Sequence, residues 1–340
     1  MDKKYLILSI VLFSFLGALI TYIIFFDNPD GSKKEPTKLF TETISKVSGG
    51  NREEEMSSKS TFADKDAVNI LLIGKDIGKE RRSKGQTGYN TDILILFTIN
   101  PKKNKVLLTS FPRDIWQNNS KINGILVTQG MDSLFDAMSK ISGQKIDKYI
   151  AVDFDGIRWL INQFSGIPVE VETSFTDNSF PDIYDTRTTT VSFSKGKEIM
   201  NGERVLTFAR SRKGDNGEGS DLKRAKRQHQ ILKGIVNSVE KEDSKFFPFK
   251  IDEFYNEVIK NMETNVSLED AYYVFSFYKN IKDYQIQSLV LDDRYIYHPT
   301  DASPYGGAWV FIAKDAGFKK LHSDINDYLF TDVNPLDTQQ

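Results

Sequence analysis

The segment that most constrains this chain is residues 5–26, a charge-free and mostly apolar run of 22 residues. As a helix rising about 1.5 Å per residue, it would cover the roughly 30 Å hydrocarbon core of a bilayer. Lys3 and Lys4 precede the run and Asp27 follows it, which favours a cytoplasmic amino terminus. We therefore expect a short cytoplasmic tail at 1–4, one membrane-spanning helix, and the rest of the chain outside the cytoplasm.

A cleaved signal peptide is the competing interpretation of the same segment. The apolar core of such a peptide usually runs about 7 to 15 residues and ends at a small-residue cleavage site. The sequence Phe25-Phe26-Asp27-Asn28 supplies no such site. Retention as a signal-anchor is therefore favoured.

Composition excludes several function classes. The net charge of -2 argues against a nucleic-acid partner, because nucleic-acid-binding domains usually carry a basic surplus. The chain has no cysteine, so disulfides, thiolate zinc sites and thiol nucleophiles are excluded. His229, His298 and His322 lack metal-ligand spacing, and no Gly-x-Ser-x-Gly elbow of a serine hydrolase is present.

The remaining sequence predicts a linker followed by one α/β domain. Residues 27–65 are rich in Lys, Glu, Ser, Thr, Gly and Pro, which is typical of a flexible extracytoplasmic linker. Buried strands are expected at 68–73, 93–99, 106–110 and 306–312. Apolar spacing predicts helices at 131–141, 154–164, 224–239 and 318–329. We expect one continuous domain over 66–330, with a core at 68–240, a completion at 241–330 and a tail at 331–340.

The densest positive charge lies within residues 208–228, which contain Arg210, Arg212, Arg224 and Arg227 and end at Gln228. Guanidinium groups grip phosphate through paired hydrogen bonds, so the pattern indicates a diphosphate or phosphorylated lipid. Local ion pairs are the alternative, since the same stretch contains Asp215, Glu218 and Asp221. The glycine-rich run 213–219 has no Walker ending, and we interpret it as a mobile loop.

Polar residues also flank the predicted strands. Asp76 follows the first strand, Asp92 opens the second and Arg113 follows the third. Ligands of α/β sheets gather beyond strand ends, and Mg²⁺ is commonly held by one or two carboxylates plus phosphate oxygens and waters. Asp76 and Asp92 fit that role. Turn or helix-cap residues are the alternative for both.

The order and spacing of several motifs resemble the LytR-CpsA-Psr family of membrane-anchored cell-wall enzymes. The matching segments are 69–76, Thr91-Asp92, 110–114, 121–123, 152–156, 166–169, 200–212 and 221–228. The resemblance covers about residues 68–239, with a weaker continuation to about 330. It implies an α-β-α sandwich with a mixed central sheet, whose core holds a polyprenyl chain.

The resemblance further implies a phosphotransfer reaction. A peptidoglycan hydroxyl would attack a polyprenyl-pyrophosphate-linked glycan, the glycopolymer would become phosphodiester-linked to peptidoglycan, and polyprenyl phosphate would leave. A polyprenyl-pyrophosphate hydrolase and a non-catalytic lipid or cell-wall binding module stay open as alternatives. We expect the protein to contact membrane lipid and expect no nucleic-acid partner.

The same resemblance assigns the site residues. It places Mg²⁺, or Mn²⁺ instead, on Asp76 and Asp92. It implies that six residues bind the pyrophosphate or hold the groups around it: Arg113, Arg210, Arg212, Arg224, Arg227 and Gln228. The catalytic set is Asp76, Asp92 and Arg113. By chemistry alone, either carboxylate near the metal is a candidate general base. One departure is Asn90, which stands where the family commonly has arginine; Arg81 or Arg82 would have to supply the missing charge.

Overall fold

The computed structural model describes residues 50–78, 82–85, 87–163, 166–181, 187–219, 251–278, 284–332 and 335–336, together with single positions between 223 and 238. The predicted membrane helix at 5–26 lies outside this described part. Within the described part, no helix combines the length and the apolar character needed to cross a bilayer.

The chain separates into two compact units, and each is built from stretches that are not consecutive. One unit contains residues 77–87 and 153–261, and the other contains 49–76, 88–152 and 262–340. We call them the arginine unit and the sheet unit, after the groups that each carries. The predicted division near residue 240 lies among residues outside the described part.

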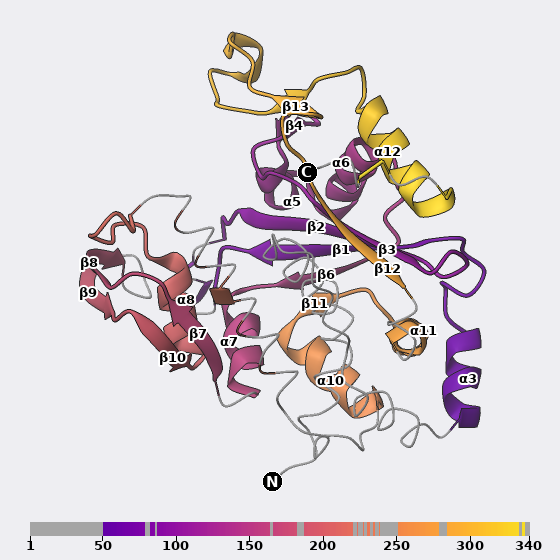
Figure 1. The fold of residues 1–340 in the computed structure, drawn as a ribbon, viewed down its shortest axis with the longest axis horizontal. Coiled ribbons are helices and arrows are strands. Elements are labelled where there is room, and N and C mark those ends of the chain that lie inside the picture. The colour runs from indigo at the N-terminus through magenta and orange to yellow at the C-terminus, as the bar shows by residue number, and fades with distance from the viewer. Residues whose placement is uncertain are drawn as a thin grey trace. The chain divides into compact units, whose positions relative to one another are not determined.

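The sheet unit is organised around a six-stranded sheet in the order β11-β6-β1-β2-β3-β12 (Figure 1). The strands are β1 (Val68–Lys75), β2 (Thr91–Asn100), β3 (Lys105–Ser110), β6 (Lys148–Val152), β11 (Glu263–Thr264) and β12 (Gln285–Val290). β1, β2 and β3 pair antiparallel, whereas β6 joins β1 and β12 joins β3 in parallel. The predicted mixed central sheet and its first three strands are confirmed.

The helices of the sheet unit lie on both sides of this sheet (Figure 1). The helices of the unit are α3 (Gly50–Ser58), α5 (Ile122–Gln129), α6 (Met131–Ser142), α11 (Leu268–Tyr278) and α12 (Lys319–Phe330). Leu71 and Leu107 of the sheet share one buried cluster with Met138 of α6 and Ile325 of α12. α6 forms because its apolar residues recur at three- and four-residue spacing and so make a single buried stripe. The predicted helices at 131–141 and 318–329 are confirmed.

Two stretches of the sheet unit differ from the sequence expectation. Part of the predicted linker is folded, since α3 packs on α11 and Phe62 is fully buried. Ser60 anchors this stretch by donating to the buried carboxylate of Asp270 at 2.8 Å. The strand predicted at 306–312 is mostly absent. That stretch follows a 3₁₀ turn, η4 (Ser303–Tyr305), and only its last residue enters a strand, β14 (Ile312–Ala313), which pairs with β13 (Ile296–Tyr297).

The arginine unit contains two antiparallel strand pairs together with helices. Its elements are α7 (Phe154–Gln163), β7 (Ile167–Val171), β8 (Phe175–Pro181), β9 (Thr188–Phe193), β10 (Gly196–Met200), α8 (Gly202–Arg210) and α10 (Ile251–Asn261). β10 pairs with β7 and β8 with β9. α7 and α8 pack closely, because a Cβ on Gly202 would lie 2.4 Å from the carbonyl oxygen of Arg158. The helix predicted at 154–164 is confirmed.

Candidate functional site

A β-bulge places Asp92 at the end of the central sheet. Gly74 pairs with Ile93 while Lys75 pairs with Thr91, so Asp92 is the extra residue of β2. Bulges interrupt the alternation of side chains, bend the strand and redirect a side chain. The backbone amide of Asp76 continues the pairing, because it donates to the Asn90 carbonyl at 2.9 Å. The two predicted metal-binding carboxylates therefore lie at the same sheet end, Asp92 in β2 and Asp76 immediately after β1, and both are half-buried.

Arg113 reaches this strand end from the segment after β3. Its Nη1 donates to Asp92 Oδ1 at 3.0 Å, and its Nε lies 3.6 Å from Asp114 Oδ2. The Arg113 side chain is 34% exposed and that of Asp92 is 26% exposed. The pair is thus partly accessible, so a ligand can approach the guanidinium without the chain first unfolding.

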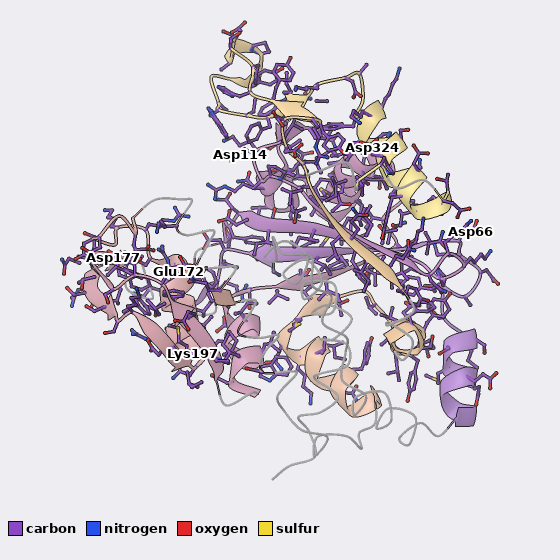
Figure 2. The ribbon with its side chains drawn as sticks, in the orientation of Figure 1. Asp66, Asp114, Glu172, Asp177, Lys197 and Asp324 are labelled. Carbon is purple, nitrogen blue, oxygen red and sulfur yellow. The ribbon has the colours of Figure 1, made fainter. Side chains whose placement is uncertain are left out.

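Further bonds hold the segment that carries Arg113. Lys121 Nζ donates to Asp114 Oδ1 at 2.7 Å, and the backbone amide of Asn123 donates to the Arg113 carbonyl at 3.2 Å. Thr91 Oγ1 donates to the Asn123 carbonyl at 3.1 Å. Asp114 is labelled in Figure 2. These bonds join residues 121–123 to the segment that carries Arg113 and to β2. We use the name strand-end cluster for Asp76, Asp92, Arg113, Asp114 and Lys121.

The strand-end cluster can be tested for its fit to Mg²⁺. Mg²⁺ prefers carboxylate oxygens and usually keeps several waters, so two carboxylates on one sheet end are chemically suitable. Among the described residues, no group of three or more His, Asp or Glu is placed to hold a metal on its own. A magnesium ion held by these two carboxylates would take its remaining oxygens from water or from phosphate.

In the arginine unit, Arg210 is the last residue of α8. The helix begins at the cap Asn201, whose side chain accepts from the Arg204 amide at 2.9 Å. The guanidinium of Arg210 lies 4.9 Å from the ring centre of Phe154 and 5.5 Å from that of Phe180. Aromatic faces attract a guanidinium and fix its orientation while leaving its edge available for hydrogen bonds.

Asp177 organises the chain just beyond Arg210. Its carboxylate, which is 1% exposed, accepts from the Ser211 hydroxyl at 2.7 Å and from the amides of Arg212 and Lys213 at 3.2 and 3.1 Å. It also accepts from the Ser179 amide at 2.9 Å. Burial opposes ionisation, but these hydrogen bonds outweigh it and hold the pKa of Asp177 below its ordinary value. Asp177, on β8 (Figure 2), thereby fixes the backbone that carries the exposed Arg212.

Arg227 has a buried role in the same unit. It is 2% exposed, and its guanidinium donates to the Phe208 carbonyl at 3.0 Å, to Glu218 Oε2 at 3.0 Å and to the Ser211 carbonyl. Glu218 also accepts from Lys223 at 2.8 Å, and this bond raises the pKa of Lys223. The local ion pair considered as the alternative to phosphate binding therefore occurs at Arg227. Arg224 and Gln228 lie outside the described residues.

The glycine-rich run at 213–219 is hydrogen-bonded to residues 174–176. The Asp215 amide donates to the Thr176 carbonyl at 3.0 Å, the Thr176 amide returns a bond to Asp215 Oδ1 at 2.7 Å, and Asn216 donates to the Ser174 carbonyl at 2.8 Å. A Cβ on Gly214 would meet the Phe175 ring at 2.6 Å. The sequence predicts a mobile loop for this run, whereas the structure bonds it to its neighbours. Its glycine instead permits close packing, and its polar side chains make turns.

The structure thus distributes the predicted residues over both units. Asp92 and Arg113 are in direct contact, and Asp76 immediately follows the strand that pairs with β2. Arg82, the candidate substitute for the missing arginine, is engaged with Asp153 in the arginine unit, and Arg81 lies outside the described residues. Asp177 was missed by sequence reasoning. It stands within a strand of Thr, Asn and Ser and belongs to no recognisable motif, so no local signal could have singled it out.

Fold and strand-end cluster together define a mixed α/β protein with a carboxylate–guanidinium pair at the end of its central sheet. The crystal structure of Bacillus subtilis TagV shares this fold, with a TM-score of 0.55, 26% identity, and coverage of 79% of this chain and 99% of that one. A Streptococcus agalactiae protein, gbs0355, also shares it, with a TM-score of 0.57, 23% identity, and coverage of 85% and 93%.

The sequence profile of the LytR_cpsA_psr family matches residues 37–325. This chain belongs to the LytR-CpsA-Psr family, and the recognition made from its motifs is confirmed.

Two relatives of known name are similar to this chain in sequence. The polyisoprenyl-teichoic acid–peptidoglycan teichoic acid transferase TagV of Bacillus subtilis is 28% identical over 264 residues, which is 75% of this chain and 64% of TagV. Biofilm regulatory protein A of Streptococcus mutans is 29% identical over 230 residues, which is 63% of this chain and 54% of that protein. The chain thus matches less than two thirds of the length of these relatives.

Proposed function

We propose that this chain is a membrane-anchored phosphotransferase that moves a glycopolymer from a polyprenyl-pyrophosphate carrier onto a peptidoglycan hydroxyl. The new bond joins the acceptor oxygen to the sugar-proximal phosphorus, and the bond from that phosphorus to the bridging oxygen breaks. Polyprenyl phosphate leaves, and the proton of the acceptor hydroxyl passes to a base. Family membership and the names of the transferase relatives support the reaction class.

One structural observation supports the proposal most directly. Arg113 and Asp92 form a half-exposed ion pair at the sheet end where Asp76 also lies. A guanidinium in that position can neutralise charge on phosphate oxygens, while Asp92 and Asp114 hold its orientation before a ligand arrives. Positioning and charge neutralisation are the main needs of phosphoryl transfer.

Asp76 and Asp92 would hold the Mg²⁺. A bound Mg²⁺ would neutralise pyrophosphate oxygens and favour departure of the lipid phosphate. Arg113 bonds one oxygen of Asp92 and thereby restricts how that carboxylate can turn. Either carboxylate remains a candidate for the group that accepts the acceptor's proton.

For the arginine unit, we propose different roles for different arginines. Arg212 is exposed and Arg210 is half-buried, so both are suited to contact the pyrophosphate. Arg227 is buried against backbone carbonyls and Glu218, so we propose that it positions the 208–218 segment. Arg224 and Gln228 keep the pyrophosphate-binding role that their motif implies.

The same proposal includes where the enzyme works. It comprises a membrane anchor at 5–26, a linker, and an extracytoplasmic α-β-α sandwich whose core holds the lipid chain. A carrier lipid resides in the membrane, so an anchored enzyme meets its substrate at the bilayer surface. Residues 5–26 are long enough for that anchor.

The test is a mass-spectrometric assay with the full chain in neutral detergent, a polyprenyl-pyrophosphoryl oligosaccharide, a peptidoglycan oligomer and Mg²⁺. We expect a phosphodiester-linked adduct that is lost in Asp76→Ala and Arg113→Ala. Lys197→Ala is the control variant, because Lys197 is an exposed residue of β10 and is not among the predicted site residues.

The same assay separates the competing functions. Free sugar phosphate without adduct would establish the pyrophosphate hydrolase instead. Unchanged substrate together with retained lipid binding would establish a non-catalytic binding module. Either result would overturn the transferase proposal.

A further inference from the structure

The sheet unit presents a group of aromatic rings that the proposed chemistry does not use. We call Trp116, His298, Tyr305, Trp309 and Phe311 the aromatic platform. Trp309 stacks on His298 with ring centres 5.0 Å apart and meets Phe311 edge-on at 4.7 Å. Trp116 meets Tyr305 edge-on at 5.5 Å. Trp309 nevertheless remains 51% exposed.

The rings are held by backbone bonds as well as by one another. His298 Nδ1 bonds the Val310 carbonyl at 2.9 Å, which ties the two sides of the hairpin together beside Trp309. Asp301 Oδ1 accepts from the Ser303 amide at 2.8 Å in the intervening turn. A large ring held in one orientation but half exposed is a feature of interaction surfaces, because stability alone would favour its burial.

The aromatic platform is attached directly to the strand-end cluster. The Phe311 amide donates to the Asp114 carbonyl at 3.0 Å, and the Trp116 amide donates to the Phe311 carbonyl at 2.8 Å. Ile115 and Phe311 form a bridge between these two bonds. Asp114 is the immediate neighbour of Arg113, so one short ladder connects the aromatic platform to the guanidinium of the proposed reaction.

Charge selects among possible ligands of this surface. Residues 292–311 contain three aspartates and one arginine, and residues 113–121 around Trp116 contain one arginine, one lysine and one aspartate, which together give -2 + 1 = -1 with histidine neutral. A phosphate-rich polymer or an anionic lipid surface would be repelled, since such surfaces attract basic segments. A neutral ligand with apolar faces is favoured, because the negative face of an aromatic ring attracts the slightly positive C–H groups of a pyranose.

We propose that the aromatic platform binds a neutral glycan, a chain of β-linked N-acetylhexosamines, and so holds the sugar backbone of the acceptor next to the strand-end cluster. Trp309 stacks on a pyranose face, and the aspartate, serine and threonine side chains of 300–303 supply hydrogen bonds to hydroxyl and acetamido groups. The identity of this glycan as the acceptor rests on the proposed function. Its binding does not, because no donor is needed.

Binding can be measured on the full chain in neutral detergent with the hexamer of β-1,4-linked N-acetylglucosamine. We expect saturable binding detected by saturation-transfer NMR and by the change in tryptophan fluorescence. Trp309→Ala should weaken binding about tenfold, whereas Trp309→Phe should retain most of it. Tyr305→Ala is a second variant that should also weaken binding. Phe330→Ala is the matched control, because Phe330 is another exposed aromatic residue and ends α12.

Two further probes decide whether another ligand class uses this surface. Polyglycerol phosphate tests a polyanion, and brominated phosphatidylglycerol in mixed micelles tests lipid by quenching of Trp309. We expect neither to compete with the hexamer or to quench the Trp309 signal. Strong competition by the polyanion, Trp309-dependent quenching by the lipid, or no hexamer binding would each overturn the proposal.

Transfer kinetics then separate this inference from the proposed function. Trp309→Ala should raise KM for the peptidoglycan acceptor about tenfold with kcat little changed. Transfer by a wild-type protein that does not bind the hexamer would overturn the glycan site and leave the transferase intact. Hexamer binding without transfer would overturn the transferase and leave the glycan site intact.

Discussion

Replacing Asp177 should destabilise the segment that carries Arg212 while leaving the side chain of every residue proposed to contact substrate unchanged. Oδ2 of Asp177 accepts three hydrogen bonds, from Ser211, Arg212 and Lys213, while Oδ1 accepts one from Ser179. In Asp177→Ala all four donors lose this acceptor, and the site is too buried for water to replace it freely. In Asp177→Asn the amide oxygen can occupy the Oδ2 position and keep three.

The two variants should therefore differ in size of effect. Bonds to a charged acceptor contribute about 1.5 to 3 kcal/mol each, and burying the charge offsets part of that sum. We expect about 3 kcal/mol of local destabilisation for Asp177→Ala. Asp177→Asn should lose about 1.4 kcal/mol, because its amino group faces the Ser179 amide and it lacks the charge.

Hydrogen exchange of the Arg212 and Lys213 amides measures this directly in the full chain. Exchange should accelerate about a hundredfold in Asp177→Ala and about tenfold in Asp177→Asn, since 1.4 kcal/mol is a factor of ten. Transfer activity should fall in the same order if Arg212 contacts substrate. Equal acceleration in both variants, or none in the alanine variant, would refute the reasoning from the hydrogen bonds.

Acid provides an independent check on the same carboxylate. The pKa of Asp177 is lowered in the folded state, so the unfolded state binds more protons near its ordinary pKa of about 3.9. Its stabilising contribution is fully present above that pKa and is lost as pH falls through the folded value. Exchange of the Lys213 amide should accelerate on acidification beyond its intrinsic dependence in the wild type, and this excess should be absent in Asp177→Asn.

Three further outcomes follow from the site and its support. Arg113→Lys should lower kcat about tenfold or more with the fold intact by circular dichroism, because lysine cannot copy the paired geometry of the guanidinium; wild-type turnover in the lysine variant would contradict this. Gly214→Ala should lower the melting temperature of the full chain, as overpacking against Phe175 costs about 1–3 kcal/mol, and an unchanged melting temperature would count against that contact. Chelation should abolish transfer and Mg²⁺ should restore it in the wild type but not in Asp92→Asn, measured by adduct formation; equal restoration in both would remove Asp92 from the metal site.

Much of the fold could be predicted from periodicity because the strands are buried on both faces. Four consecutive apolar residues, 70–73, precede Gly74, and the predicted end of β1 lies within two residues of the observed end. α3 was missed because its sequence is polar and charged, and it is held by packing on α11 and by the nearby bond of Ser60 to Asp270. Such long-range contacts leave no pattern in the local sequence.

The site divides in the same way. Asp92 and Arg113 could be proposed as site residues from the sequence for two reasons. Ligands gather at strand ends, and both residues lie in motifs whose order along the chain resembles the family. The density of arginines could not show that Arg227 is buried, since Glu218 and two carbonyls in front of it in the sequence become its partners only on folding. The bulge at Asp92 was equally hidden, because register is a property of strand pairs.

The ladder between Phe311 and Asp114 makes the strand-end cluster depend on the order of synthesis. Arg113 precedes Phe311 by 311 - 113 = 198 residues. β12, which pairs with β3 immediately before Arg113, also comes from the last fifth of the chain. The segment that carries Arg113 thus lacks its contacts with Phe311 and β12 until those later residues are available. Such distant pairings form slowly. A chain that is still emerging would carry all three predicted catalytic residues but would lack the pairings with Phe311 and β12 that complete this end of the sheet.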